Sequence, residues 1–168
     1  MDGTELRAIQ APLKERYRSE PAAALVTLKA EGRLDEENIS CSIATGRALA
    51  EAGLHPATGG SGMLACSGDM LLEALVACAG VTMCSVASAL GIEIGGTVRA
   101  EGDLDFRGTL GMAKDENVPV GFRAIRLAFD VEHAASDEQV AKLMELTERY
   151  CIVLQTLSGG VPVAVTTA

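Results

Sequence analysis

The feature that most constrains the fold is a long stretch without charge. ALVACAGVTMCSVASAL runs from Ala74 to Leu90 and contains two cysteines, and the uncharged run continues to Ile92. Glu73 precedes the run and Glu93 ends it. Its nineteen residues are about enough to span the hydrocarbon core of a bilayer. The run is therefore a membrane segment, a buried structural helix or a helix that carries a thiol site.

The composition and flanks of the run favour a buried helix over a membrane span. More than half of its residues are Ala, Gly, Ser, Thr or Cys, both flanks are acidic, and no cluster of Lys or Arg marks a cytoplasmic side. Ser67 is a good N-cap for a helix over residues 68–90, and Gly91 is a typical stop signal. Asp69 falls in the first turn, where it favours the positive end of the helix dipole. We predict a central helix that is wrapped by a sheet or by a second subunit.

The charge balance argues against several classes of partner. The chain has 23 Asp and Glu against 14 Lys and Arg, a net charge of −9, so nucleic acid and anionic membranes would meet like charge. Residues 1–21 form a polar leader without the apolar core of a signal peptide, which predicts a cytoplasmic protein. At this length we expect residues 1–168 to form a single domain.

Hydrophobic periodicity predicts an α+β domain whose antiparallel sheet is covered by helices on one side. Period-two alternation marks the strands, and SDEQ at 136–139 is a capping-box pattern that opens a second helix. Before the long helix we expect a partly helical leader at PLKERYR, a hairpin of strands 24–32 and 38–44 with its tip at 31–37, and a short helical piece with a Gly-rich loop over 47–62. After the long helix we expect strands over 98–106 and 125–131 with a loop at 109–121 between them. A helix with one apolar stripe from Val140 through Tyr150 to Cys151 and a terminal strand VPVAVTT complete the chain.

The five cysteines do not show a metal-binding pattern. They contain no C-x-x-C pair, and the two histidines are far apart in the sequence, so we expect neither a zinc nor an iron–sulfur site. A free cysteine is most often a small buried hydrophobe, which is the simplest interpretation of each one taken alone. The cysteines are Cys41, Cys66, Cys78, Cys84 and Cys151, and the histidines are His55 and His133.

The two cysteines of the long helix lie on different faces. At about 100° per residue, Cys84 shares the side that Asp69 and Glu73 mark. Cys78 points to the opposite side, inward. A reactive cysteine has to be a thiolate, and Cys78 lies too far from the helix start for the dipole to stabilise that charge. Activation has to come from elsewhere, and an arginine is the natural supplier, although periodicity leaves open which one.

Two segments resemble the OsmC/Ohr family of osmotically inducible and organic hydroperoxide resistance proteins. SGDMLLEALVACAGVTMCSVASALGIEI is similar to that family's central helix, which is apolar and Ala-rich and carries the first active cysteine at the position of Cys78. RYCIVLQTLSGGVPV is similar to the second cysteine segment, a Cys followed by a short helix and a terminal strand, and corresponds to Cys151. The order of elements agrees from the first hairpin to the C-terminus.

The resemblance implies an OsmC-like fold and an intertwined homodimer, with the two central helices wrapped by sheets from both subunits. It also implies a thiol-dependent peroxidase that reduces organic, fatty-acid type hydroperoxides in defence against oxidative stress. In that chemistry Cys78 becomes a sulfenic acid and then forms a disulfide with Cys151, the resolving cysteine. No metal, haem or flavin takes part, and an external dithiol such as dihydrolipoamide reduces the disulfide.

The resemblance also implies a catalytic arginine. At the position of the glutamate that pairs with this arginine, the chain departs from the family pattern. The family's arginine follows a Gly at the tip of the first hairpin, and KAEGRLDE places Arg33 there. The family commonly has a glutamate ten residues before the first cysteine, where this chain has Gly68, with Asp69 next to it. Two hypotheses follow. One is a peroxidase whose site is Cys78, Cys151 and Arg33, and the other is a small-molecule binding dimer of the same fold whose cysteines are structural.

Overall fold

The computed structural model describes residues 4–5, 8, 10–12, 15, 19–20, 32–35, 40–44, 49–111 and 118–167, and of residues 32–35, 40–44 and 49 it describes the backbone. Contacts divide the chain into two compact units. The first unit comprises Met1–Ala24, Ala74–Arg99 and Ala128–Ala168. The second unit comprises Leu25–Glu73 and Ala100–Leu127.

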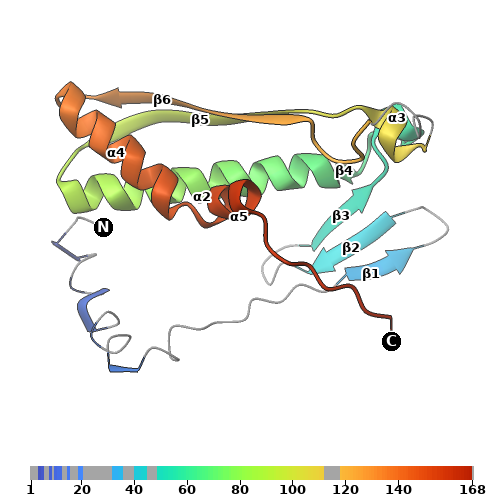
Figure 1. The fold of residues 1–168 in the computed structure, drawn as a ribbon, viewed down its shortest axis with the longest axis horizontal. Helices are drawn as coiled ribbons and strands as arrows, with labels where there is room; N and C mark the ends of the chain where they lie inside the picture. The colour runs from blue at the N-terminus through green and yellow to red at the C-terminus, as the bar shows by residue number, and fades with distance from the viewer. Residues whose placement is uncertain are drawn as a thin grey trace. The chain divides into compact units, whose positions relative to one another are not determined.

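Helices and strands follow one another along the chain as in an α+β protein (Figure 1). Outside the leader, the helices among the described residues are the 3-10 helix η2 (Pro56–Thr58), α2 (Ser67–Leu90), α3 (Phe106–Thr109), α4 (Asp137–Tyr150) and α5 (Ile152–Gly159). The strands are β1 (Gly32–Asp35), β2 (Ser40–Ala44), β3 (Leu49–Gly53), β4 (Ala65–Cys66), β5 (Ile94–Asp103) and β6 (Ala124–His133). The α+β class predicted from the sequence is confirmed.

α2 is the predicted long helix, and it ends at the signal in the sequence. Gly91 has a φ of 71°, a left-handed backbone that glycine adopts without strain. The N–H of Ile92 then donates to the Ala87 carbonyl over 2.9 Å and closes the C-terminus of the helix. The buried residues of α2 repeat at every fourth position and form one face: Leu75, Ala79, Met83 and Ala87.

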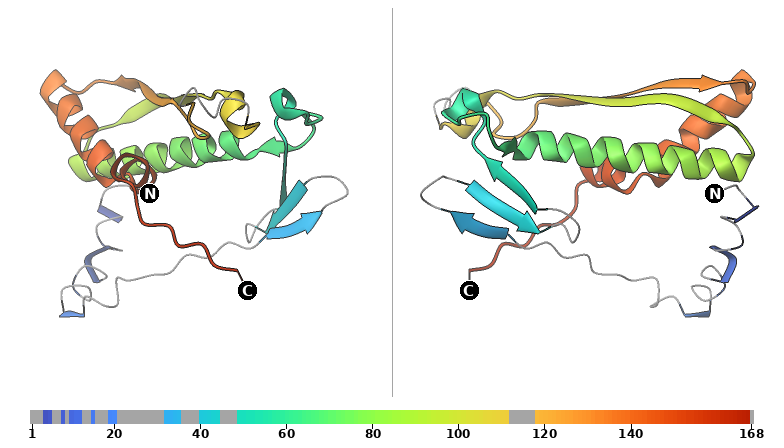
Figure 2. Two further views of the ribbon diagram at one scale, coloured as in Figure 1. Left: turned by 45° about the vertical axis from the view of Figure 1, so that its right-hand side comes forward. Right: turned by 180° about the vertical axis from the view of Figure 1, so that it is seen from behind.

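Within the first unit, the buried face of α2 packs against the two-stranded sheet and α4. Figures 1 and 2 show β5 and β6 side by side and running in opposite directions, with α2 along them. The hydrophobic cluster there consists of Met83, Ala87, Ile92 and Leu143, with Phe129 and Val131 of β6 packed against it. One side of α2 is therefore covered by its own chain.

The other side of α2 is open in the single chain. Among the described residues, α2 is long and apolar enough to cross a membrane by length and composition, criteria that a core helix of a soluble protein also meets. Only 28% of its most apolar window is buried. Four exposed residues, Ala74, Ala77, Val81 and Cys84, form what we call the open stripe. An apolar surface of this kind needs a further covering surface.

β5 and β6 follow the predicted alternation. Along β6 every second residue is half-buried, at Ile125, Leu127, Phe129 and Val131, and β5 has the same period at Val98 and Ala100. The prediction is wrong at Phe106, which begins α3 instead of extending the strand. The Asp105 carboxylate accepts the Arg107 N–H and caps this short helix, so the backbone leaves the sheet there.

The second unit contains a four-stranded sheet in the order β1-β2-β3-β4. β1 pairs antiparallel with β2, and β2 with β3, but β3 and β4 are parallel, whereas we predicted an antiparallel sheet throughout. The first hairpin pairs residues 32–35 with 40–43; we predicted strands over 24–32 and 38–44, and residues 24–31 lie outside the described residues. β3 covers the start of the segment 47–62, where we predicted a helical piece, because pairing with β2 overrides the local helical preference of its alanines. A short 3-10 helix, η2 (Pro56–Thr58), does lie within that segment.

α4 confirms the predicted capping box. Ser136 Oγ accepts the Gln139 N–H over 3.4 Å, and Gln139 Oε1 accepts the Ser136 N–H over 3.0 Å. Leu143 and Thr147 are buried on the predicted stripe. The prediction that Tyr150 belongs to this stripe is wrong. Tyr150 is 57% exposed because α4 ends there.

The two ends of the chain differ in how they match the predictions. In the leader, the described residues Pro12 and Glu15 of PLKERYR are helical, as expected. Residues 160–167 are not a strand, although VPVAVTT was predicted to be one. Within the described part of the chain no strand pairs with this segment, and its valines, Val161, Val163 and Val165, are exposed. A strand requires a neighbour for its N–H and C=O groups.

Candidate active site

Cys78 and Cys151 lie together in the first unit. Cys78 is half-buried on α2, and Cys151, which separates α4 from α5, is 0% exposed. Both thiols are free, and the Cys151 thiol donates a hydrogen bond to the Cys78 sulfur. The fold therefore brings together two cysteines that periodicity could not relate.

Three further donors reach the Cys78 sulfur. The N–H groups of Ile152 and Val153, the first two residues of α5, donate to it, and so does the hydroxyl of Thr82 on α2. The first N–H groups of a helix have no partner inside the helix. Cys151 is the N-cap of α5, and the Val153 and Leu154 amides also donate to its sulfur. The two sulfurs therefore share the amide groups at the start of α5.

These contacts give the two thiols different acidities. Burial raises the pKa of Cys78, but hydrogen bonds from the Val153 amide, the Cys151 thiol and the other two donors together lower that pKa below its ordinary 9.0. Burial raises the pKa of Cys151, and hydrogen bonding to Cys78 and the charge of Cys78 raise it further, which outweighs the lowering by hydrogen bonds from the Leu154 and Val153 amides. Cys78 is therefore the better nucleophile of the pair.

The N-terminus of α5 is a source of activation that the sequence analysis missed. We predicted an arginine beside Cys78, whereas the four donors that the structure places at its sulfur are uncharged. No capping residue marks the start of α5, since Cys151 leads directly into the apolar run IVL. The sequence contains one signal for the start of α5, which is that the apolar stripe of α4 ends at Cys151.

The other two positions of the predicted site belong to the second unit. Arg33 is in β1 opposite Ser42, not at the hairpin tip, and its side chain lies outside the described residues, so its role stays a prediction. Gly68 is the second residue of α2. A Cβ atom built on Gly68 would lie 3.4 Å from the Phe122 ring and 3.6 Å from Cys66 Sγ, ordinary van der Waals contacts. Packing does not require a glycine at this position.

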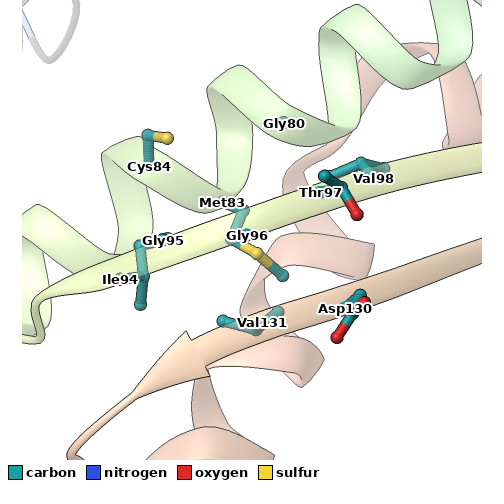
Figure 3. A pocket seen from close by; sticks show the side chains of 10 residues that line it. All are labelled: Gly80, Met83, Cys84, Ile94, Gly95, Gly96, Thr97, Val98, Asp130 and Val131. Carbon is teal, nitrogen blue, oxygen red and sulfur yellow. The ribbon is translucent and has the colours of Figure 1, made fainter.

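Two other cysteines, Cys84 and Cys66, line surface pockets. In the first unit, a pocket of about 200 Å³ lies between α2 and the strands, with Met83 reaching toward the strands and the exposed Cys84 at the rim (Figure 3). In the second unit, Cys66 lines a pocket of about 350 Å³ with His55, whose ring stacks on Phe106 at a centroid distance of 4.7 Å. Within the described ranges, no three His, Cys, Asp or Glu side chains are grouped so that they could hold a metal ion.

The chain is similar to known proteins in sequence pattern and in fold. A family model described as OsmC-like protein matches residues 60–166, which include both cysteines of the pair but not Arg33. No curated protein sequence matches the chain.

Three solved structures illustrate the similarity in fold. An OsmC-like protein from Mycoplasma pneumoniae has a TM-score of 0.65 at 19% identity, over 80% of this chain and 89% of its own. An organic hydroperoxide resistance protein from Elizabethkingia anophelis has a TM-score of 0.59 at 17% identity, over 82% and 91%. The organic hydroperoxide resistance protein OhrB of Bacillus subtilis has a TM-score of 0.53 at 22% identity, over 82% and 95%. At these identities the similarity establishes the fold.

Proposed function

The chain belongs to the OsmC-like protein family, and from this premise we propose that it is a cysteine-based peroxidase that reduces organic hydroperoxides. The observation that carries the proposal is the contact between Cys78 and Cys151, in which hydrogen bonds lower the pKa of the first thiol and burial raises that of the second. A peroxidatic cysteine has to be a thiolate, and its resolving partner has to lie within reach. The lowered pKa of Cys78 and its hydrogen bond with Cys151 support both requirements.

In the proposed reaction both sulfurs take part in turn. The Cys78 thiolate attacks the outer oxygen of the peroxide, the O–O bond breaks, and the alkoxide leaves and takes up a proton to become an alcohol. Cys78 is now a sulfenic acid. The sulfur of Cys151, already in contact, attacks the Cys78 sulfur, and the disulfide forms as water leaves. An external dithiol of the dihydrolipoamide class then reduces the disulfide and is itself oxidised to a disulfide.

The relatives and the surface near Cys78 support an organic substrate. Two of the similar structures are organic hydroperoxide resistance proteins. Ile152, whose amide contacts the Cys78 sulfur, exposes 76% of its surface and offers apolar contact to a hydrocarbon chain. We extend the proposal to fatty-acid type hydroperoxides, to a role in defence against oxidative stress, and to Arg33 as the catalytic arginine that activates Cys78.

The open stripe of α2 supports a second copy of the chain as the partner. Its residues, Ala74, Ala77, Val81 and Cys84, follow the spacing of the seam of a coiled coil. Their small side chains allow two helices to approach closely. We propose an intertwined homodimer in the cytoplasm that acts on a small-molecule hydroperoxide and a dithiol, with no metal or other cofactor, and that binds neither nucleic acid nor membrane.

Disulfide mapping tests the function directly. Reduced protein is treated with one equivalent of cumene hydroperoxide, and its disulfides are mapped by mass spectrometry. We expect a bond between Cys78 and Cys151, and we expect Cys78→Ser to abolish both this bond and peroxide consumption. Cys84→Ser, a matched control on the same helix, should lose neither. In Cys151→Ser the reaction should stop at a sulfenic acid that dimedone labels.

Two outcomes would change the assignment. If both thiols remain free after the oxidant, the peroxidase proposal fails, and the small-molecule binding dimer with structural cysteines takes its place. Arg33→Ala is expected to slow peroxide consumption by about tenfold or more, because the cation that favours the Cys78 thiolate is lost. Unchanged consumption would move that role to Arg16, Arg18 or Arg47.

A further inference from the structure

The junction between α4 and α5 breaks the helix in a way that exposes amide groups to Cys78. In an α-helix each N–H donates to the carbonyl four residues earlier. The N–H of Cys151 still does so, to Thr147 O over 3.0 Å. Cys151 itself has extended backbone, with φ −73° and ψ 106°, so the next amide, that of Ile152, is directed to the Cys78 sulfur instead. The break therefore produces the amide donors of the site.

The same break leaves the Glu148 carbonyl without its usual helical donor, and Gln155 replaces that donor. Gln155 Nε2 donates to Glu148 O over 2.9 Å. The backbone N–H of Gln155 donates to Cys151 O, also over 2.9 Å. Gln155 thus holds the first turn of α5 to the last turn of α4 through its side chain, and to the cap residue through its main chain.

We propose that Gln155 is a positioning residue that keeps the Ile152 and Val153 amides at the Cys78 sulfur by tying α5 to the end of α4. The proposal rests on the proposed function in one respect, that Cys78 is the reacting thiol. Gln155 is exposed, and its side-chain amide donates to the Glu148 carbonyl. Its effect on Cys78 is therefore indirect, through the orientation of α5.

The groups at the Cys78 sulfur make this effect measurable as a pH profile. Of the four donors, only the Cys151 thiol titrates, whereas the Thr82 hydroxyl and the two amides keep their protons at all accessible pH values. Hydrogen bonds to a charged acceptor are stronger than neutral ones. If the two amides move away from the Cys78 sulfur, the thiolate form of Cys78 is therefore destabilised more than the thiol form.

The test compares two Gln→Met variants. Gln155→Met keeps the length of the side chain and removes the donor, and Gln139→Met removes a side chain of the same type from the capping box at the far end of α4. Reduced protein is alkylated with iodoacetamide over a range of pH, and the Cys78 peptide is quantified by mass spectrometry. We expect Gln155→Met to slow Cys78 alkylation at pH 7 by about threefold to tenfold and to move the midpoint of its pH profile upward. Gln139→Met should leave the profile in place.

The readout separates this proposal from the peroxidase activity, because no peroxide is used. An unmoved midpoint in Gln155→Met, or the same shift in both variants, overturns the positioning role even if the wild-type chain consumes peroxide. A shifted midpoint in Gln155→Met alone supports it even if no peroxide is consumed. Should Gln155→Met fail to fold, Gln155→Asn is measured, whose amide is one methylene short and which should give the same upward shift.

Discussion

Cys78 and Cys151 are chemically different because of their neighbours. Cys78 accepts hydrogen bonds from four donors on α2 and at the start of α5. Cys151 is fully buried and lies against the sulfur that becomes negatively charged. The thiolate thus forms first on the sulfur that points at a helix N-terminus, where the positive end of the dipole stabilises negative charge.

The pH dependence of Cys78 should follow these donors. Because hydrogen bonds hold its pKa below 9.0 in the folded protein, its alkylation rate should fall as the pH decreases through that lowered value, and the midpoint of the profile should lie below that of the unfolded chain. Cys151→Ala removes one donor and should slow alkylation at pH 7 by about twofold to tenfold. Thr82→Val should slow it less, since Thr82 makes the smallest contribution of the four. A larger effect of Thr82→Val would contradict this order of the donors.

At the scale of the element, β5 shows how one glycine allows two strands to lie close together. Gly96 has a φ of 111°, and a Cβ atom built on it would lie 2.0 Å from the Asp130 carbonyl oxygen of β6. The neighbouring Gly95 has no such restriction, because its Cβ would meet Glu132 Oε2 at 3.4 Å, an ordinary contact. The backbone at Gly96 therefore requires glycine, both for its dihedral angle and for its space.

These two glycines provide a matched pair of variants. Gly96→Ala is expected to destabilise the protein by about 2–4 kcal/mol, since it adds left-handed strain to a backbone clash. Gly95→Ala should change the free energy of unfolding by no more than about 0.5 kcal/mol. Urea unfolding of the reduced proteins measures both values. Equal losses in the two variants would show that the close approach of β5 to β6 at Gly96 is not needed.

On the scale of the whole molecule, two apolar surfaces are exposed among the residues that the structure describes. The open stripe of α2 includes Val81, which is 73% exposed. The C-terminal segment carries Val161, Val163 and Val165 at alternate positions, and all three are exposed. Alternating valines are typical of a half-buried strand. Both surfaces are explained if a second copy covers the helix and pairs with the segment.

The proposed dimer should therefore depend on the open stripe. Val81→Glu places a charge at its centre and is expected to convert the dimer to a monomer, because burying an unpaired carboxylate is costly. Leu90→Glu is the control, since Leu90 is also exposed, at 39%, but lies about 180° around the helix from Val81. Analytical ultracentrifugation measures the mass of each variant. A dimeric Val81→Glu would mean that another surface holds the copies together.

The sequence by itself determined the elements whose signals are local. The charge-free run and Gly91 predicted α2 and its end, alternation predicted the inner faces of β5 and β6, and the capping box predicted the start of α4. Each signal depends on the backbone preferences and side-chain spacing of one segment. The family resemblance, confirmed by the match to residues 60–166, added the overall fold.

Tertiary structure alone decided the features that depend on distant neighbours. Leu49–Gly53 is a strand because β2 lies beside it, although its own residues suit a helix. Residues 160–167 form no strand in the single chain because none of the described strands pairs with them. Cys78 obtains its activating donors from the break at Cys151, far along the chain. Periodicity shows which way a side chain points, but the donor it meets is set by the packing of another element.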